Sequence, residues 1–315
     1  MRINSLPLRQ YVIHIFIPVV IASAGFPAVG SAEDRLDRSK LGKLTFSDEF
    51  DGAKLSLYEP RTKRGTWKTS FFYGDQNGSS SRRAQETIFV EPAYSGVNPF
   101  FLEEGKVSLE LRSVTRPNDP KLDGAKFTAG LLSTERTFSQ TYGYWEARIA
   151  MPDVPGTWPA FWLWSSPVKD LTGTQWNGEW TGGLDDEIDI VEGQGVRPGK
   201  TLHTAHKRFK WKDRTGGERV EFKKVESLQV DIKQTAVPRT YGLLWTREEL
   251  VWYVDDERVY RCSNHGWRSP MYIILSMGAG GWDGNDIRAG FDSARLGIDY
   301  VRVYTLEKAS QTIPN

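Results

Sequence analysis

Short runs of alternating apolar and polar residues follow one another along this chain of 315 residues. Residues 44–50 alternate between the two classes, which is typical of a strand with one buried face. Other short apolar runs, bounded by Gly, Pro, Asn and Asp, predict further strands. These runs lie at residues 87–90, 100–102, 106–111, 127–133, 142–151, 160–165, 186–192, 201–205, 239–245, 249–255, 258–262, 271–277 and 296–304.

The pattern contains no convincing amphipathic helix longer than about ten residues, no internal repeat and no linker. Polar segments within 74–98, 116–125, 166–183 and 207–220 predict long loops. Evenly spread strands without helices favour one all-β domain, a sandwich of two curved antiparallel sheets. A concave sheet face would form an open cleft, which suits a polymer better than a small molecule.

The first 32 residues have the layout of a secretory signal peptide. Arg2 and Arg9 give a basic start, 11–21 is mostly apolar, and 30–32 are small residues at a cleavage position. We expect the mature domain to comprise residues 33–315, secreted or periplasmic and not membrane-bound. An uncleaved anchor is the alternative.

Composition narrows the class of protein further. Lys and Arg number 41 against 40 Asp and Glu, so there is no electrostatic case for binding nucleic acid or a membrane surface. Cys262 is the only cysteine, so the fold must be stabilised by its core rather than by an intrachain disulfide. The 12 Trp residues exceed what core filling usually needs. We expect at least half of them in the core, and others are candidates to stack on sugar rings.

The segment 186–192, Asp-Glu-Ile-Asp-Ile-Val-Glu, carries the strongest chemical signal. On a strand, Glu187 and Asp189 share a face, whereas Glu192 has the wrong parity. A β-bulge at Ile190-Val191 would turn Glu192 back beside the other two. Asp186 has the opposite parity to Glu187 and is left out of the predicted site.

Three neighbouring carboxylates cannot all remain ionised cheaply, so we expect one to hold a proton beside an ionised partner. Glycoside hydrolysis with retention uses such a pair about 5–5.5 Å apart. The alternative interpretation is a solvated edge strand whose charges prevent aggregation.

Several motifs, in order along the chain, resemble glycoside hydrolase family 16. They are Phe-Ser-Asp-Glu-Phe at 46–50, Tyr-Gly-Tyr-Trp-Glu-Ala-Arg at 142–148, Gly-Thr-Trp-Pro-Ala-Phe-Trp-Leu-Trp at 156–164, the carboxylate motif at 187–192, Gly-Gly-Trp at 280–282 and Ile-Asp-Tyr-Val-Arg-Val-Tyr at 298–304. The resemblance covers roughly residues 43–305. It implies a β-jelly-roll that hydrolyses β-linked polysaccharides with retention.

The resemblance also implies roles for the three carboxylates. Glu187 would be the nucleophile, Glu192 the acid and then the base, and Asp189 the group that tunes the pKa of Glu187. Trp158 and Trp162 match positions that line the sugar-binding cleft, although core packing is an alternative for both.

A histidine near the reacting sugar is a further implication of the resemblance. His203 and His206 are three residues apart and face opposite ways on a strand, so at most one can serve, and we favour His206. Glu49 and Asp299 match positions where some members hold a structural calcium ion. No cofactor is expected to be required for catalysis, and we expect a monomer.

Segments 67–70, 96–100 and 128–134 resemble bacterial endo-β-glycanases that trim exopolysaccharides of the succinoglycan type. The partner would then be a β-linked polysaccharide that contains glucose and galactose, with or without acidic substituents. Alternatives are a β-1,3(1,4)-glucanase or laminarinase, a transglycosylase, or a non-catalytic sugar-binding module on the same fold. The basic cluster Lys207, Arg208, Lys210, Lys212 and Arg214 could contact an acidic polymer or form a solvated loop.

Overall fold

The computed structural model of the chain describes residues 34–71, 80–82, 87–103, 105–165, 186–195, 197, 199–212, 218–232, 235–280, 287 and 290–307. The expected signal peptide at 1–32 lies outside these residues. In the part of the chain that is described, no helix has both the length and the apolar character needed to cross a membrane.

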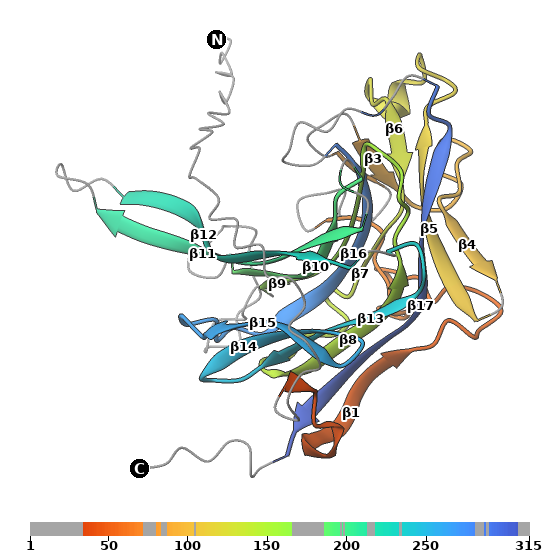
Figure 1. Cartoon of the computed structure of the whole chain (residues 1–315). Coiled ribbons are helices and arrows are strands. Elements are labelled where there is room, and N and C mark those ends of the chain that lie inside the picture. The colour runs from red at the N-terminus through yellow and green to blue at the C-terminus, as the bar shows by residue number, and fades with distance from the viewer. Residues whose placement is uncertain are drawn as a thin grey trace, which may run out of the picture.

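The described residues build two β-sheets that pack face to face, one of eleven strands and one of six (Figure 1). The larger sheet contains β1 (Leu41–Asp48), β2 (Ser80–Arg82), β3 (Thr87–Val90), β4 (Phe100–Glu103), β5 (Lys106–Ser113), β6 (Phe127–Ala129), β8 (Gly143–Ala150), β13 (Arg239–Trp245), β14 (Glu249–Val254), β15 (Glu257–Ser263) and β17 (Ser293–Leu306). The smaller sheet contains, in spatial order, β12 (Glu218–Asp231), β11 (Lys200–Lys212), β10 (Glu187–Gly193), β9 (Thr157–Ser165), β16 (Met271–Ala279) and β7 (Leu131–Ser133).

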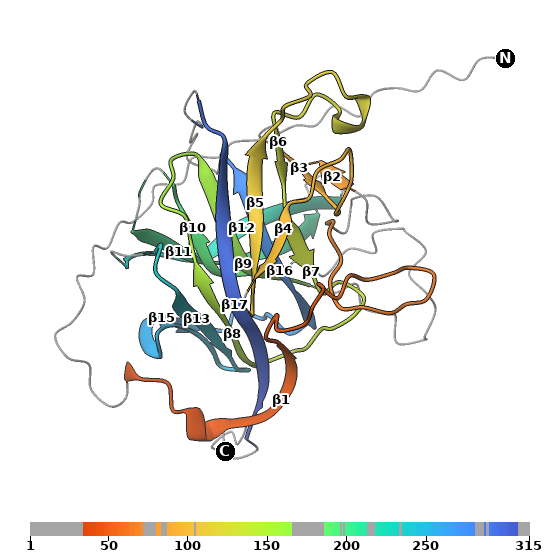
Figure 2. The same cartoon turned by 90° about the vertical axis from the view of Figure 1, so that its right-hand side faces the viewer.

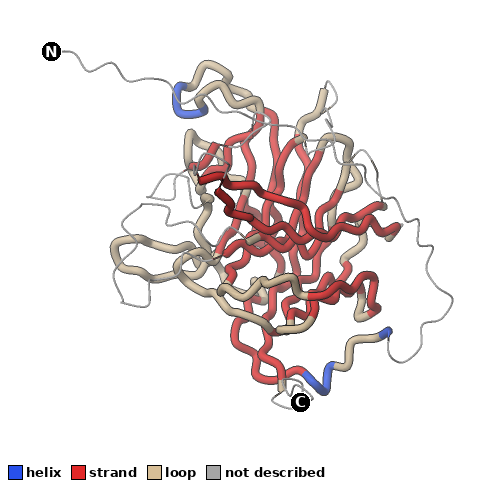
Figure 3. The backbone as a smooth tube through the Cα atoms, turned by 90° about the vertical axis from the view of Figure 1, so that its left-hand side faces the viewer, coloured by secondary structure: helices blue, strands red, loops and turns tan. Residues whose placement is uncertain are grey.

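Strands dominate the described chain, alongside the short 3-10 helices η2 (Arg38–Lys40) and η3 (Pro120–Leu122) (Figure 3). The long strand β17 lies between β5 and β8 in the larger sheet and also pairs with β1 (Figure 2). Pairing is antiparallel apart from the parallel pair β3–β6. The predicted all-β sandwich of two antiparallel sheets, a β-jelly-roll, is therefore confirmed.

One large apolar cluster fills the space between the two sheets. Ile188, Leu163 and Ile273 enter it from the smaller sheet, and Leu243 and Val301 enter it from the larger one. Five of the eight tryptophans whose side chains the structure describes are among the largest fully buried side chains, which confirms for this part that most indoles serve the core. The fully buried tryptophans are Trp67, Trp145, Trp245, Trp252 and Trp267.

The apolar run at 127–133 predicted one strand, but the structure divides it into β6 and β7 in different sheets. The division falls at Gly130, where an added Cβ would lie 3.1 Å from the carbonyl oxygen of Pro99. The chain therefore crosses from one sheet to the other where only a glycine fits closely against the neighbouring backbone.

The predicted loop at 207–220 is wrong over most of its length. β11 continues to Lys212 and β12 begins at Glu218, so the two strands form a long ribbon that extends beyond the sheet (Figure 1). Phe209 and Trp211 alternate with basic residues, and Val220 and Phe222 alternate with charged residues, so the sequence did carry a strand signal there. The high density of charged residues around these four positions favoured a loop instead.

Candidate active site

β10 lies between β9 and β11, and its register with both neighbours shows how the three carboxylates are arranged. Its relevant pairs with β9 are Glu187 with Trp164, Asp189 with Trp162 and Glu192 with Ala160. The register shifts between Asp189 and Val191, which leaves Ile190 as the extra residue. The predicted bulge is therefore present at the predicted place.

The register with β11 leads to the same conclusion. Its pairs are Glu187 with His206, Asp189 with Thr204 and Glu192 with Leu202. Partners on both neighbours are spaced by two residues, and such residues share one face of a strand. Glu187, Asp189 and Glu192 therefore lie on one face of the smaller sheet, which we call the carboxylate face.

The bulge also shortens the row of carboxylates. Glu187 and Glu192 are opposite residues four apart on each neighbouring strand, or about 13 Å at ~3.3 Å per residue. A regular strand would separate them by about 16 Å. The shorter backbone separation brings the carboxyl groups of Glu187 and Glu192 closer together. A double-displacement reaction requires two carboxyl groups close to the same glycosidic bond.

Trp158 and Trp162 both lie on the carboxylate face, where each indole donates a hydrogen bond. Trp158 Nε1 donates to Glu192 Oε1 at 2.8 Å, so this tryptophan contacts a predicted catalytic group directly. Trp162 Nε1 donates to Ser276 Oγ at 3.2 Å. Both tryptophans are half-buried, and core packing alone does not account for Trp158.

His206 faces Asp189, with Nε2 at 3.3 Å from Asp189 Oδ2. One ligand atom from each of Glu187, Asp189 and His206 lies within 4.8 Å of the others. Among the described residues, this trio is the group of His, Cys, Asp and Glu side chains that could hold a metal ion. The resemblance implied a histidine near the reacting sugar, and His206 lies beside two of the three predicted catalytic carboxylates.

His203 lies on the opposite face of β11, as the spacing predicted, and is completely buried in the core. Burial lowers the pKa of its imidazole to about 4, so the ring is neutral near pH 7. His203 thus has no place on the carboxylate face.

Asp186 is also held away from the carboxylates. Lys207 Nζ lies 3.2 Å from Asp186 Oδ2 and donates to the carbonyl oxygen of Gly266 at 2.8 Å. Burial raises the pKa of the Asp186 carboxyl, and Lys207 opposes that shift. Lys207 is therefore engaged at the start of β10. The side chains of the other four basic residues in its predicted cluster lie outside the described residues.

Both residues predicted to bind calcium are paired with arginines. Glu49 accepts from Arg302 through both carboxylate oxygens, at 2.9 and 2.7 Å. Arg148 Nε donates to Asp299 Oδ2 at 3.2 Å. Guanidinium groups occupy oxygens that calcium would need, so these side chains do not favour the ion. The calcium site stays a prediction based on the resemblance alone.

Several residues of the carboxylate face were not predicted individually. Trp164 lies opposite Glu187, and Thr204 lies opposite Asp189. The even spacing of Trp158, Trp162 and Trp164 could have predicted that Trp164 shares a face with the other two tryptophans. Nothing in the local sequence identifies Ser276, which comes from β16. The motif residues Gly281 and Trp282 lie outside the described residues.

At the other end of the sheet, Lys68 pairs with Ser133, which continues the row that runs through Trp162 to Asp189. Lys68 forms a buried ion pair with Glu135. Opposite residues in such a row share a face, so this pair belongs to the carboxylate face. It was not predicted, because Lys68 and Glu135 are 67 residues apart in the chain.

Together, the fold and this site define a β-jelly-roll protein with three carboxylates on one face of its smaller sheet. The model of Glycosyl hydrolases family 16 matches residues 98–302. The chain belongs to this family.

Individual proteins agree with the family match. The endo-1,3-1,4-β-glycanase ExsH of Rhizobium meliloti is 31% identical over 86% of this chain and 53% of its own length. The β-glucanase of Rhodothermus marinus is 30% identical over 86% of this chain and 88% of its own. A solved LamA variant from Z. galactanivorans, in complex with laminaritriose and laminaritetraose, is 25% identical with a TM-score of 0.60, covering 84% of this chain and 100% of its own. The chain thus spans about half the length of the Rhizobium relative.

Proposed function

We propose that this protein is an endo-acting, retaining β-glycanase that hydrolyses internal β-glycosidic bonds of a polysaccharide. The observation that carries the proposal is the bulge at Ile190, which brings Glu192 to the face that holds Glu187 and Asp189. A strand that served only to discourage aggregation would have no need of this shift in register.

In the first step, a Glu187 carboxylate oxygen bonds to the anomeric carbon while the bond to the leaving oxygen breaks. Glu192 gives its proton to that leaving oxygen. Asp189 lies between the two glutamates in the row, where it can tune the pKa of Glu187. The product of this step is a glycosyl-enzyme with an ionised Glu192.

In the second step, Glu192 takes a proton from water, and the water oxygen bonds to the anomeric carbon. The bond to Glu187 breaks, which restores both carboxyl groups. The hydrogen bond from Trp158 to Glu192 suits a group that must be acid and base in turn, because the neutral indole accommodates both forms. His206 beside Asp189, together with the indole of Trp162, supports sugar binding next to these groups.

For the substrate, we propose a bacterial exopolysaccharide of the succinoglycan type. Support comes from the segments 67–70, 96–100 and 128–134 and from the likeness to a Rhizobium endo-1,3-1,4-β-glycanase. A β-1,3(1,4)-glucan is the second candidate, favoured by the likeness to LamA in complex with laminari-oligosaccharides. We further propose action outside the cytoplasm, on the strength of the signal-like pattern at 1–32.

A panel of polymers tests the function and the substrate together. Viscosity and reducing ends are followed on succinoglycan-type exopolysaccharide, laminarin, mixed-linkage glucan and agarose. We expect a fast fall in viscosity with few new reducing ends on the exopolysaccharide, because internal cuts shorten chains early. Longer products than the starting oligomer at high substrate concentration would indicate transglycosylation instead.

The same panel distinguishes an enzyme from a non-catalytic sugar-binding module. If no polymer were cleaved and Glu187→Ala bound one of them as tightly as the parent protein, the catalytic proposal would fail. The non-catalytic jelly-roll would then be the better description.

A further inference from the structure

Two backbone carbonyl oxygens at the bulge in β10, those of Asp189 and Ile190, have side chains as hydrogen-bond partners. Neither side chain belongs to the neighbouring strand β9. The extra residue of a bulge is unpaired in the ladder, and a buried carbonyl without a partner is costly. The Ile190 oxygen lies 2.6 Å from His203 Nδ1. The Asp189 oxygen accepts a hydrogen bond from Trp252 Nε1 at 3.0 Å.

The two partners come from different parts of the fold and are completely buried. His203 lies on β11, the next strand of the same sheet, whereas Trp252 lies on β14 of the other sheet. The indole of Trp252 therefore reaches through the core to the back of the catalytic strand. The bulge is fixed from the side opposite the carboxylates.

The two bonds of the His203 ring define a single tautomer. Nδ1 faces a carbonyl oxygen, which can only accept, so Nδ1 carries the hydrogen. Nε2 lies 3.1 Å from Thr201 Oγ1 and accepts from that hydroxyl. The ring is thereby held as a neutral donor of fixed orientation.

We propose that His203 and Trp252 are positioning residues that hold the bulge, and through it the alignment of Glu192 with Glu187. A one-residue change of register turns every later side chain to the opposite face of a sheet. Loss of the bulge would therefore point Glu192 into the core. The inference rests on the proposed glycanase activity and assigns a catalytic purpose to two residues behind the site.

Two buried tryptophans provide a matched test. Trp245 Nε1 donates to the backbone oxygen of Trp267 at 3.2 Å, so it resembles Trp252 in burial and bonding, but its hydrogen bond goes to Trp267 rather than to the backbone of β10. Trp252→Phe and Trp245→Phe are compared by Tm, by kcat and KM on the polymer, and by kcat on an aryl β-glycoside with an activated leaving group.

We expect both variants to lower Tm, and only Trp252→Phe to lower kcat on the polymer, by about 100-fold with little change in KM. The loss on the activated glycoside should be smaller, because that substrate does not need the proton of a displaced Glu192. Equal losses of kcat in the two variants would overturn the inference.

A second pair of variants remains informative if Trp252→Phe fails to fold. His203→Asn keeps an N–H donor near the position of Nδ1, whereas His203→Leu removes it. We expect the asparagine to retain most of the activity and the leucine to reproduce the selective loss on the polymer. Equal activity of the two variants would count against the proposal.

Hydrogen exchange separates this inference from the proposed activity. Amides of residues 186–195 should exchange faster in Trp252→Phe than in Trp245→Phe, whether or not the protein cleaves any substrate. An inactive parent protein with this exchange pattern would refute the glycanase proposal and retain the positioning role. Unchanged exchange in an active enzyme would refute the positioning role alone.

Discussion

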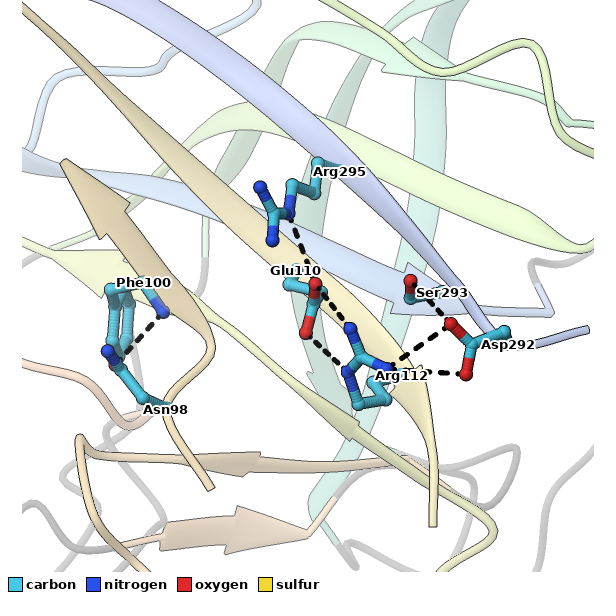
Figure 4. A network of polar contacts seen from close by, with 7 residues as sticks. All are labelled: Asn98, Phe100, Glu110, Arg112, Asp292, Ser293 and Arg295. Carbon is cyan, nitrogen blue, oxygen red and sulfur yellow. Dashed lines mark hydrogen bonds and ion pairs between the residues drawn. The ribbon is translucent and has the colours of Figure 1, made fainter. Parts of the chain in front are cut away.

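Glu110 on the larger sheet differs from Asp189 and Glu192 on the smaller sheet in the kind of side chain that contacts it. On the larger sheet, Glu110 is buried and bound by two arginines, with Arg112 Nε at 2.7 Å and Arg295 Nε at 3.1 Å (Figure 4). Arg112 also contacts Asp292, which extends the network (Figure 4). Guanidinium groups remain charged at any ordinary pH, so the two arginine partners of Glu110 do not change their charge.

On the smaller sheet, an indole and an imidazole take the place of guanidinium groups in the contacts described above. Trp158 donates to Glu192, and His206 faces Asp189. An indole is neutral, and an imidazole can exist in a neutral or a charged form. The contrast teaches that a permanently paired carboxylate stabilises the fold, whereas a carboxylate with a neutral or titratable partner can exchange a proton during a reaction.

The largest test of this contrast removes one carboxylate from each sheet. Glu187→Ala should lower kcat by roughly 10⁴-fold or more, because no other group replaces the nucleophile, while Tm and polymer binding stay near those of the parent. Glu110→Ala should leave kcat unchanged and lower the free energy of unfolding by about 1–3 kcal/mol, because it strands two arginines. Assays of turnover with urea unfolding measure both. Activity of Glu187→Ala close to that of the parent protein would exclude it as nucleophile.

The second test concerns the proton that Glu192 must deliver. Glu192→Ala should lower kcat on the polymer by about 10²–10⁴-fold, the range of general acid–base catalysis. The loss should be much smaller on an aryl glycoside whose leaving group needs no proton. Steady-state kinetics on the two substrates compare these losses, and equal values would contradict the acid–base role.

The arrangement of the carboxylate face could be predicted from sequence because the signal was local. Strand parity placed Glu187 and Asp189 together, and the wrong parity of Glu192 predicted the bulge. Contacts between distant segments carried no such signal. The bond from Trp252 joins residues 63 positions apart, and the pairing of Glu49 with Arg302 joins residues 253 positions apart.

The sequence also failed to predict strands in which charged residues outnumber apolar ones. Charged residues separate the apolar positions of the β11–β12 ribbon, so its strands were not predicted. Short periods in sequence predict the faces of strands well. They do not predict which side chains meet across a sandwich.

The third prediction extends the comparison to the histidine behind the carboxylates. Burial lowers the pKa of His203 from 6.5 to about 4, so the unfolded chain binds more protons than the native protein between these values. His203 should therefore remove roughly 3 kcal/mol from the free energy of unfolding as the pH falls from about 6.5 to 4. Urea unfolding across this range checks the loss. His203→Asn does not titrate and should lack this part of the pH dependence, so parallel curves for the two proteins would refute the assignment.

The smallest expected effect concerns the indole that distinguishes Glu192 from the arginine-bound glutamates. Trp158→Phe removes this donor to the Glu192 carboxyl group, and an N–H donor favours the ionised form of a carboxyl group. Because Glu192 must be protonated in the first step, the alkaline limb of the kcat/KM profile should move to higher pH. We expect kcat to fall by about 10-fold, the lower end of the contribution of one hydrogen bond to a charged group. Trp162→Phe is the matched control, because Trp162 donates to Ser276 and should leave the limb in place. If both variants shifted the limb equally, the change would reflect a general loss of indole packing. The hydrogen bond from Trp158 would then not be what distinguishes Glu192 from the arginine-bound glutamates.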